Sequence, residues 1–168
     1  DPSFSLAVEV CKDGTTPITA TSTHTATPVV YNWDFDGGTA TGSGTGPGPH
    51  NVSWNSIGTK TVTLSVSENG CLGNPVTDTI QVKVLLAPDI KNVTTLNNDT
   101  ICVGGCVTFS ANTTGSAPIF YQWYYQSGVG TSSVGVAPEA CYPSAGNFSV
   151  VATASNTCGV DTLIKTNF

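Results

Sequence analysis

Two acidic side chains beside a glycine-rich stretch are the first residues in the chain that could bind a metal ion. Asp34 and Asp36 flank a phenylalanine, and the stretch that runs on to Pro49 is rich in glycine, threonine and proline. Ca²⁺ is bound by about six to eight oxygens from carboxylates and backbone carbonyls. With Asp13 or carbonyl groups completing the set, Asp34 and Asp36 are candidate calcium ligands. The alternative is that Asp34 points outward from a strand and Asp36 begins a turn.

The side chains needed for catalysis are scarce. The two histidines, His24 and His50, stand in neither a nucleophile motif nor a zinc motif. The serines and cysteines lack the base and the orienting third group of a catalytic triad. Cys102 and Cys106 have no second close pair with which to bind zinc. We therefore expect no enzyme, no catalytic residue and, calcium apart, no metal or cofactor.

Four aromatic residues are candidates for stacking on sugar rings. On an extended strand, Phe120 and Tyr124 point opposite to Trp123. Together with Trp54 and Tyr142 they would form an exposed platform, in which Trp54 and Tyr124 are the residues expected to contact a sugar. The alternative is that these rings pack beneath a neighbouring loop or domain.

Composition argues against several partners. The 168 residues carry 11 acidic side chains against 5 lysines and no arginine, for a net charge of −6. Because no basic patch can neutralise a phosphate backbone, nucleic acid and anionic membranes are poor partners. No apolar run approaches the roughly 18 residues that span a bilayer, and neither end resembles a signal peptide. Since the chain contains no methionine, we expect a processed protein or a piece of a longer one.

Six cysteines in a small chain with few lysines indicate an oxidising compartment. We therefore expect an extracellular or cell-surface location, with the cysteines in disulfide bonds. The cysteines are Cys11, Cys71, Cys102, Cys106, Cys141 and Cys158.

The elements that position these residues show the two-residue period of β-strands. The stretches Val29–Phe35 and Ile119–Tyr125 place a large side chain at every second residue, with Trp33 and Trp123 near their middle. Such alternation predicts a strand with one buried face. A loop rich in glycine, serine and threonine follows each stretch, so the same plan is used twice.

Length and composition fit two small all-β domains with almost no helix. Threonine, serine, glycine and asparagine favour strands joined by turns. About 84 residues suffice for a seven-strand sandwich with a modest core. We place the boundary between residues 1–86 and 87–168. The segment from Asp36 to Pro49 has hardly any apolar residue, and we expect it to be a mobile surface loop.

Two segments of the first half resemble the PKD domain, an immunoglobulin-like β-sandwich of bacterial and archaeal surface and secreted proteins. Trp33–Gly38 reads Trp-Asp-Phe-Asp-Gly-Gly, and Gly58–Val66 reads Gly-Thr-Lys-Thr-Val-Thr-Leu-Ser-Val, with Lys60 where the family often has tyrosine. In the second half Trp123 lacks the acidic followers and Ala145–Val150 is a looser match. The resemblance implies two tandem immunoglobulin-like sandwiches, a PKD domain over 1–86 and a PKD-like domain over 87–168. It implies no reaction.

The arrangement is similar to tandem copies in large cell-surface proteins of gliding and fibre-bearing Bacteroidota. By that resemblance, a cysteine ahead of each tryptophan strand pairs with one in the late turn, and the two remaining cysteines pair together. The implied bonds are Cys11–Cys71, Cys102–Cys158 and Cys106–Cys141. Closing a loop of about 60 residues would stabilise each domain by roughly 4 kcal/mol.

Three Asp-Thr-aliphatic triplets resemble the O-glycosylation signal of exported Bacteroidota proteins. They would modify Thr79, Thr100 and Thr162. The alternative is that these threonines simply favour strands.

The leading hypothesis is a non-catalytic extracellular module, a repeat of a large surface adhesin, stalk or filament. Its partners would be neighbouring copies or domains of the same protein, associating through unpaired strand edges, and surface glycans. The alternative is a carbohydrate-binding accessory module of a secreted hydrolase, which requires Trp54 or Tyr124 to be exposed.

Overall fold

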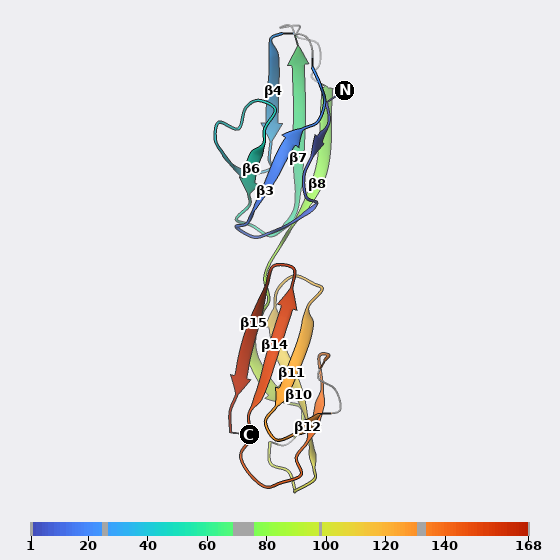
Figure 1. Ribbon diagram of the computed structural model, residues 1–168, viewed down its shortest axis with the longest axis vertical. Helices are drawn as coiled ribbons and strands as arrows, with labels where there is room; N and C mark the ends of the chain where they lie inside the picture. The colour runs from blue at the N-terminus through green and yellow to red at the C-terminus, as the bar shows by residue number, and fades with distance from the viewer. Residues whose placement is uncertain (1, 25–26, 69–75, 98, 131–133, 168) are drawn as a thin grey trace. The chain divides into compact units, whose positions relative to one another are not determined.

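The chain folds into two compact units, Asp1–Leu86 and Ala87–Phe168, which have the bounds expected from the sequence. The structure is a computed structural model that describes residues 2–24, 27–68, 76–97, 99–130 and 134–167, without the side chains of 76–80. The described residues form β-strands and no α-helix, as Figure 1 shows. This is the all-β fold that the composition predicts.

Unit 1 is a sandwich of two four-stranded sheets. The first sheet contains, in order, β1 (Phe4–Ser5), β3 (Thr15–Ala20), β6 (His50–Ser53) and β5 (Thr39–Thr41). The second contains β2 (Glu9–Cys11), β8 (Val76–Leu85), β7 (Gly58–Glu68) and β4 (Val29–Asp34). All neighbours are antiparallel except β2 and β8, which run parallel. Because each sheet has one apolar face, the two faces pack together and form one core.

The segment from Asp36 to Pro49 is more ordered than expected. Within it β5 pairs with β6, and the carbonyl oxygen of Gly46 accepts a hydrogen bond of 2.9 Å from Nε1 of Trp33. Nε2 of His50 lies 3.1 Å from the same oxygen. The segment has few apolar side chains to bury, but its backbone is held by a strand ladder and by these rings.

Unit 2 repeats the plan with a smaller second sheet. Its four-stranded sheet contains β12 (Val129–Gly130), β13 (Glu139–Cys141), β10 (Cys106–Thr114) and β9 (Asp89–Thr95). Its three-stranded sheet contains β11 (Phe120–Tyr125), β14 (Val150–Asn156) and β15 (Gly159–Lys165). In both units the tryptophan strand, β4 or β11, pairs with the strand that follows the short β6 or β13.

The inward-facing residues alternate as the sequence predicts. In β7 the side chains of Val62, Leu64 and Val66 are buried, and in β14 those of Val150 and Ala152 are. Each fully buried valine or leucine side chain contributes roughly 1.5–3 kcal/mol. The two cores are separate clusters, one in each unit.

Trp54 and Tyr142 are core residues, so the expectation that they form an exposed aromatic platform is wrong. Each directly follows the short strand β6 or β13, and each is only 2% exposed. Nε1 of Trp54 donates a hydrogen bond of 2.7 Å to the carbonyl oxygen of Phe35. A Cβ on Gly38 would lie 2.7 Å from that Nε1, and one on Gly128 would lie 2.8 Å from the ring of Tyr142. Glycine at these positions leaves room for the two rings.

Candidate functional site

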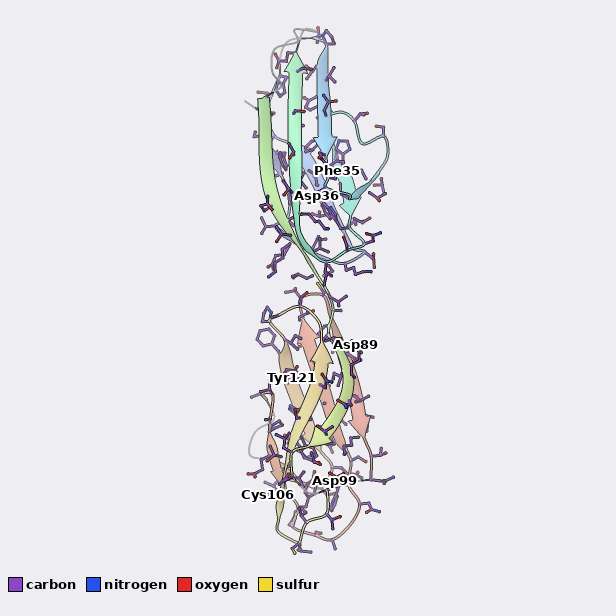
Figure 2. The ribbon with its side chains drawn as sticks, turned by 180° about the vertical axis from the view of Figure 1, so that it is seen from behind. Phe35, Asp36, Asp89, Asp99, Cys106 and Tyr121 are labelled. Atoms are coloured by element: carbon purple, nitrogen blue, oxygen red, sulfur yellow. A yellow bond between two sulfur atoms is a disulfide. The ribbon has the colours of Figure 1, made fainter. Side chains whose placement is uncertain are left out.

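The two candidate calcium ligands form backbone contacts at the end of β4. Oδ1 of Asp34 accepts the N–H of Asp36 at 2.9 Å, and Oδ2 of Asp36 accepts the N–H of Thr61 at 3.0 Å. Asp36 also has a positive φ of 50°, a turn conformation that aspartate tolerates. Figure 2 labels Asp36 next to Phe35, at the end of β4. These contacts account for both aspartates as turn-forming residues. Calcium binding stays a prediction.

The structure contains the predicted Cys106–Cys141 bond. The two residues are directly opposite each other in β10 and β13, with their Cα atoms 3.9 Å apart. Glu139 lies close to both sulfur atoms. Because the sulfurs are bonded to each other, this group offers no thiolate to a metal. The bond fastens one end of the four-stranded sheet of unit 2.

The predicted Cys102–Cys158 bond is wrong. Cys102 is an exposed free thiol, whereas Cys158 is disulfide-bonded. The backbone beside Cys102 pairs with Tyr142, which precedes β14, and Cys158 follows the end of β14. The length of that strand, about 20 Å, therefore separates the two cysteines. Cys11 is also disulfide-bonded, and Cys71 lies outside the described residues.

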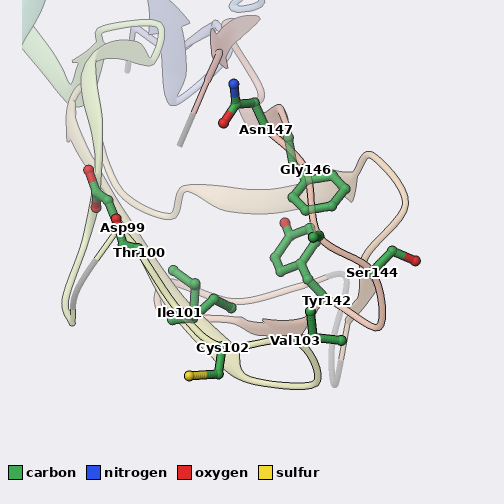
Figure 3. A pocket seen from close by; sticks show the side chains of 12 residues that line it. Asp99, Thr100, Ile101, Cys102, Val103, Tyr142, Ser144, Gly146 and Asn147 are labelled. Atoms are coloured by element: carbon green, nitrogen blue, oxygen red, sulfur yellow. The ribbon is translucent and has the colours of Figure 1, made fainter.

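A cavity of about 280 Å³ lies at the Cys102 end of unit 2 (Figure 3). Its walls include Ile101, Val107 and the stacked rings of Tyr142 and Phe148, whose centroids are 4.5 Å apart. Burial raises the pKa of Tyr142 to about 12. A phenol is already neutral near pH 7, and the raised pKa keeps it neutral at more alkaline pH as well, so Tyr142 serves as a packed ring in the cavity wall.

The expected O-glycosylation sites differ in what the structure describes of them. The side chains of Thr100 and Thr162 are exposed, and Oγ1 of Thr162 lies 3.1 Å from Oγ1 of Thr153. The side chain of Thr79 is outside the described part of the chain. Modification of all three stays a prediction.

The expected exposure of Phe120 and Tyr124 is found on the three-stranded sheet of unit 2. These side chains are 64% and 68% exposed, while Trp123 between them faces the core. The cross-strand register places Phe120 beside Ser155 and Tyr124 beside Val151. Nine residues of β11, β14 and β15 form this surface, which we call the outer face. They are Phe120, Gln122, Tyr124, Val151, Thr153, Ser155, Val160, Thr162 and Ile164.

The outer face is apolar at its two ends and polar across its middle. Val160 and Ile164 on β15 are 68% and 59% exposed. Gln122, Thr153 and Thr162 form the row between them, in register on three strands. Beside Tyr124 a shallow hollow of about 230 Å³ is lined by residues of β11 and β14. None of the nine side chains is charged.

The corresponding face of unit 1 is mostly polar along β4 and β7, so the fold itself does not require an apolar surface here. Val30, Asn32 and Asp34 of β4 occupy the positions of Phe120, Gln122 and Tyr124 relative to the strand tryptophan. Their cross-strand neighbours are Ser67, Ser65 and Thr63. The two exposed aromatic side chains on this face are therefore a property of unit 2, whereas the exposed apolar residue on β4 is Val30. Exposed apolar patches of this kind mark binding surfaces more often than isolated apolar residues do.

Sequence reasoning missed the contribution of β15. Val160, Thr162 and Ile164 alternate with half-buried residues, and that alternation was a usable signal. Either the exposed or the half-buried residues of β15 could have stood beside Tyr124. The register between β14 and β15 decides between them, and the sequence alone does not specify that register.

Comparison with known proteins identifies the fold. No protein-family model matches the chain, and no curated protein matches it. An I-band fragment of titin is 15% identical with a TM-score of 0.62, over 98% of this chain and 64% of that one. The extracellular domains 3–5 of Drosophila OTK are 13% identical with a TM-score of 0.59, over 99% of this chain and 61% of theirs. The eight N-terminal Ig domains of Down syndrome cell adhesion molecule are 12% identical with a TM-score of 0.55, over 95% of this chain and 26% of that one.

These similarities show the fold alone: the chain is a tandem pair of immunoglobulin-like β-sandwiches. It spans about three fifths of the length of the titin and OTK structures. As for membrane segments, the described residues include no helix that is long and apolar enough to cross a bilayer.

Proposed function

We propose that the chain is a non-catalytic module of a larger extracellular or cell-surface protein, in which unit 1 serves as a spacer and unit 2 carries an adhesive surface. The observation that carries this proposal is the contrast between the two tryptophan-strand sheets. One presents Val30, Asn32 and Asp34 to solvent, and the other presents Phe120, Gln122 and Tyr124 at the equivalent positions. Leaving large apolar side chains in water is unfavourable, and a partner that covers them would remove that cost.

We take the kind of parent protein from the resemblance of unit 1 to a PKD domain. The Trp33–Gly38 and Gly58–Val66 segments that resemble a PKD domain form the aromatic strand with its turn and the long β7 strand of unit 1. The disulfide between Cys106 and Cys141 suits an oxidising compartment. We therefore propose a repeat of a Bacteroidota-type surface adhesin or stalk, whose neighbouring copies or domains continue the protein.

Adhesion under flow tests this proposal. The full chain is displayed on an otherwise non-adherent bacterium, and retained cells are counted on glass coated with serum protein, with neutral polysaccharide or with the purified chain. We expect retention on at least one coating. The double variant Phe120→Ser/Tyr124→Ser should retain about tenfold fewer cells, because it removes the two exposed aromatic side chains of the surface.

The matched control is Val30→Ser, which changes the position in unit 1 equivalent to Phe120 and should leave retention unchanged. If cells are retained on the purified chain and on neither of the other coatings, the partner is a neighbouring copy, which would support a filament or stalk. Equal retention of the double variant, or no retention of the original chain on any coating, contradicts the proposal.

A further inference from the structure

The chemistry of the outer face indicates what kind of partner it binds. We propose that the outer face binds an uncharged saccharide, with Tyr124 stacking on a sugar ring and Gln122 and Thr153 hydrogen-bonding to its hydroxyl groups. This inference rests on the proposed function, because it names the partner of the same adhesive surface.

Tyr124 provides the apolar contact. Its side chain is 68% exposed and stands at the wall of the shallow hollow, beside Val151 on the neighbouring strand. The C–H face of a sugar ring is a flat apolar surface, and covering it with an aromatic ring removes apolar area from water on both sides. A tyrosine ring offers a large area at a small cost in conformational entropy, with a polar hydroxyl at its tip.

The polar row provides the hydrogen bonds. The amide of Gln122 carries two donors and an acceptor and lines the hollow together with Thr153. The hydroxyls of Thr153 and Thr162 are 3.1 Å apart, so one donates to the other and the pair keeps one donor and several acceptor positions. Sugar hydroxyls both donate and accept, and they match this mixed set.

Charge restricts the partner to a neutral one. A carboxylated or sulfated saccharide would lose hydration at the outer face, and no cationic side chain there would compensate for that loss. A basic peptide would likewise meet no carboxylate on the outer face, because unit 2 has Tyr124 at the position where unit 1 has Asp34. The absence of charge on these nine residues therefore favours an uncharged ligand over an acidic or a basic one.

The dimensions fit a chain lying on a surface. The hollow of about 230 Å³ is smaller than the roughly 300–1,000 Å³ of pockets that enclose a small molecule. Phe120 and Tyr124 are four residues apart on one strand, about 14 Å at the usual rise. Two apolar contacts at this spacing, with Gln122 between them, suit a polysaccharide that runs along β11.

Depletion assays with three insoluble neutral polysaccharides, cellulose, chitin and mannan, test the inference. The full chain is made in a host that does not glycosylate it, so that Thr162 carries no sugar. We expect at least one of the three to retain the chain. Tyr124→Ala should weaken retention about tenfold and Gln122→Ala about fivefold. Tyr124→Phe should retain most of the affinity, because it keeps the stacking ring.

Val30→Ala is the matched control in unit 1 and should bind as the original chain does. Carboxymethylated cellulose should bind no better than cellulose. Each variant changes an exposed side chain, and equal thermal midpoints would show that it remains folded. Retention on none of the three polysaccharides, or equal retention of Tyr124→Ala, overturns the inference.

Sedimentation of the same variants separates this inference from the proposed function. Dimers that form at micromolar concentration and disappear in Tyr124→Ala, without polysaccharide retention, would assign the outer face to a second copy of the chain. That outcome overturns the saccharide inference while the adhesive role of the face stands. Retention that depends on Tyr124, with monomers throughout, supports both.

Discussion

Replacing Trp54 with alanine is expected to destabilise unit 1 by about 3–5 kcal/mol. The side chain is 2% exposed, and its indole N–H donates to the carbonyl oxygen of Phe35 at 2.7 Å. Removing it leaves a large cavity and an unpaired carbonyl. Urea denaturation followed by circular dichroism measures the effect. Tyr124→Ala, which truncates an exposed ring, should change stability by less than about 0.5 kcal/mol.

A double-mutant cycle checks the physical reason. Gly38→Ala should cost about 1–3 kcal/mol, because the new Cβ would lie 2.7 Å from both Nε1 of Trp54 and Cγ1 of Val52. In a Trp54→Phe background the smaller ring leaves more room, so the cost of Gly38→Ala should fall. Strictly additive costs would show that the indole and the glycine are not packed together.

Removing the Cys106–Cys141 bond is expected to destabilise unit 2 by about 2–4 kcal/mol. The bond joins residues 35 positions apart, and cutting it restores conformational freedom to the unfolded chain. The double variant Cys106→Ser/Cys141→Ser tests this by urea denaturation. Cys102→Ser is the matched control, because Cys102 is exposed and free, and it should leave the midpoint unchanged. Equal midpoints for the two variants would contradict the assignment.

The fold follows from the sequence because strand periodicity is local. Trp33 and Trp123 stand in strands whose alternating side chains specify one buried face, and the turn residues after them end those strands. The repeat of this pattern is sufficient to place the domain boundary after Leu86. The same alternation places Phe120 and Tyr124 outside, and their exposure was predicted correctly.

Features that depend on long-range packing were not predictable in the same way. Trp54 and Tyr142 follow strands too short to show a period, so their direction depends on the space that Gly38 and Gly128 leave. The sequence does contain a repeated feature that could have indicated this packing, because each of these glycines follows its strand tryptophan by five residues.

The predicted Cys102–Cys158 pairing was wrong for a related reason, whereas the predicted Cys106–Cys141 pairing is confirmed. In each repeat the cysteine before the tryptophan strand was paired with the cysteine in the late turn. In unit 2, however, Cys102 and Cys158 lie at opposite ends of β14. Which end of a strand a cysteine occupies follows from the topology, which the order of cysteines in the sequence does not specify.

We propose that the outer face of unit 2 carries the function. Amide NMR spectra of the full chain, recorded with and without soluble fragments of the polysaccharide that retains it, test this most directly. We expect chemical-shift changes concentrated in β11, β14 and β15, with Gln122 and Tyr124 among the most affected residues. Changes confined to β4 and β7 of unit 1 or to the cavity beside Tyr142, with the outer face unaffected, would contradict it.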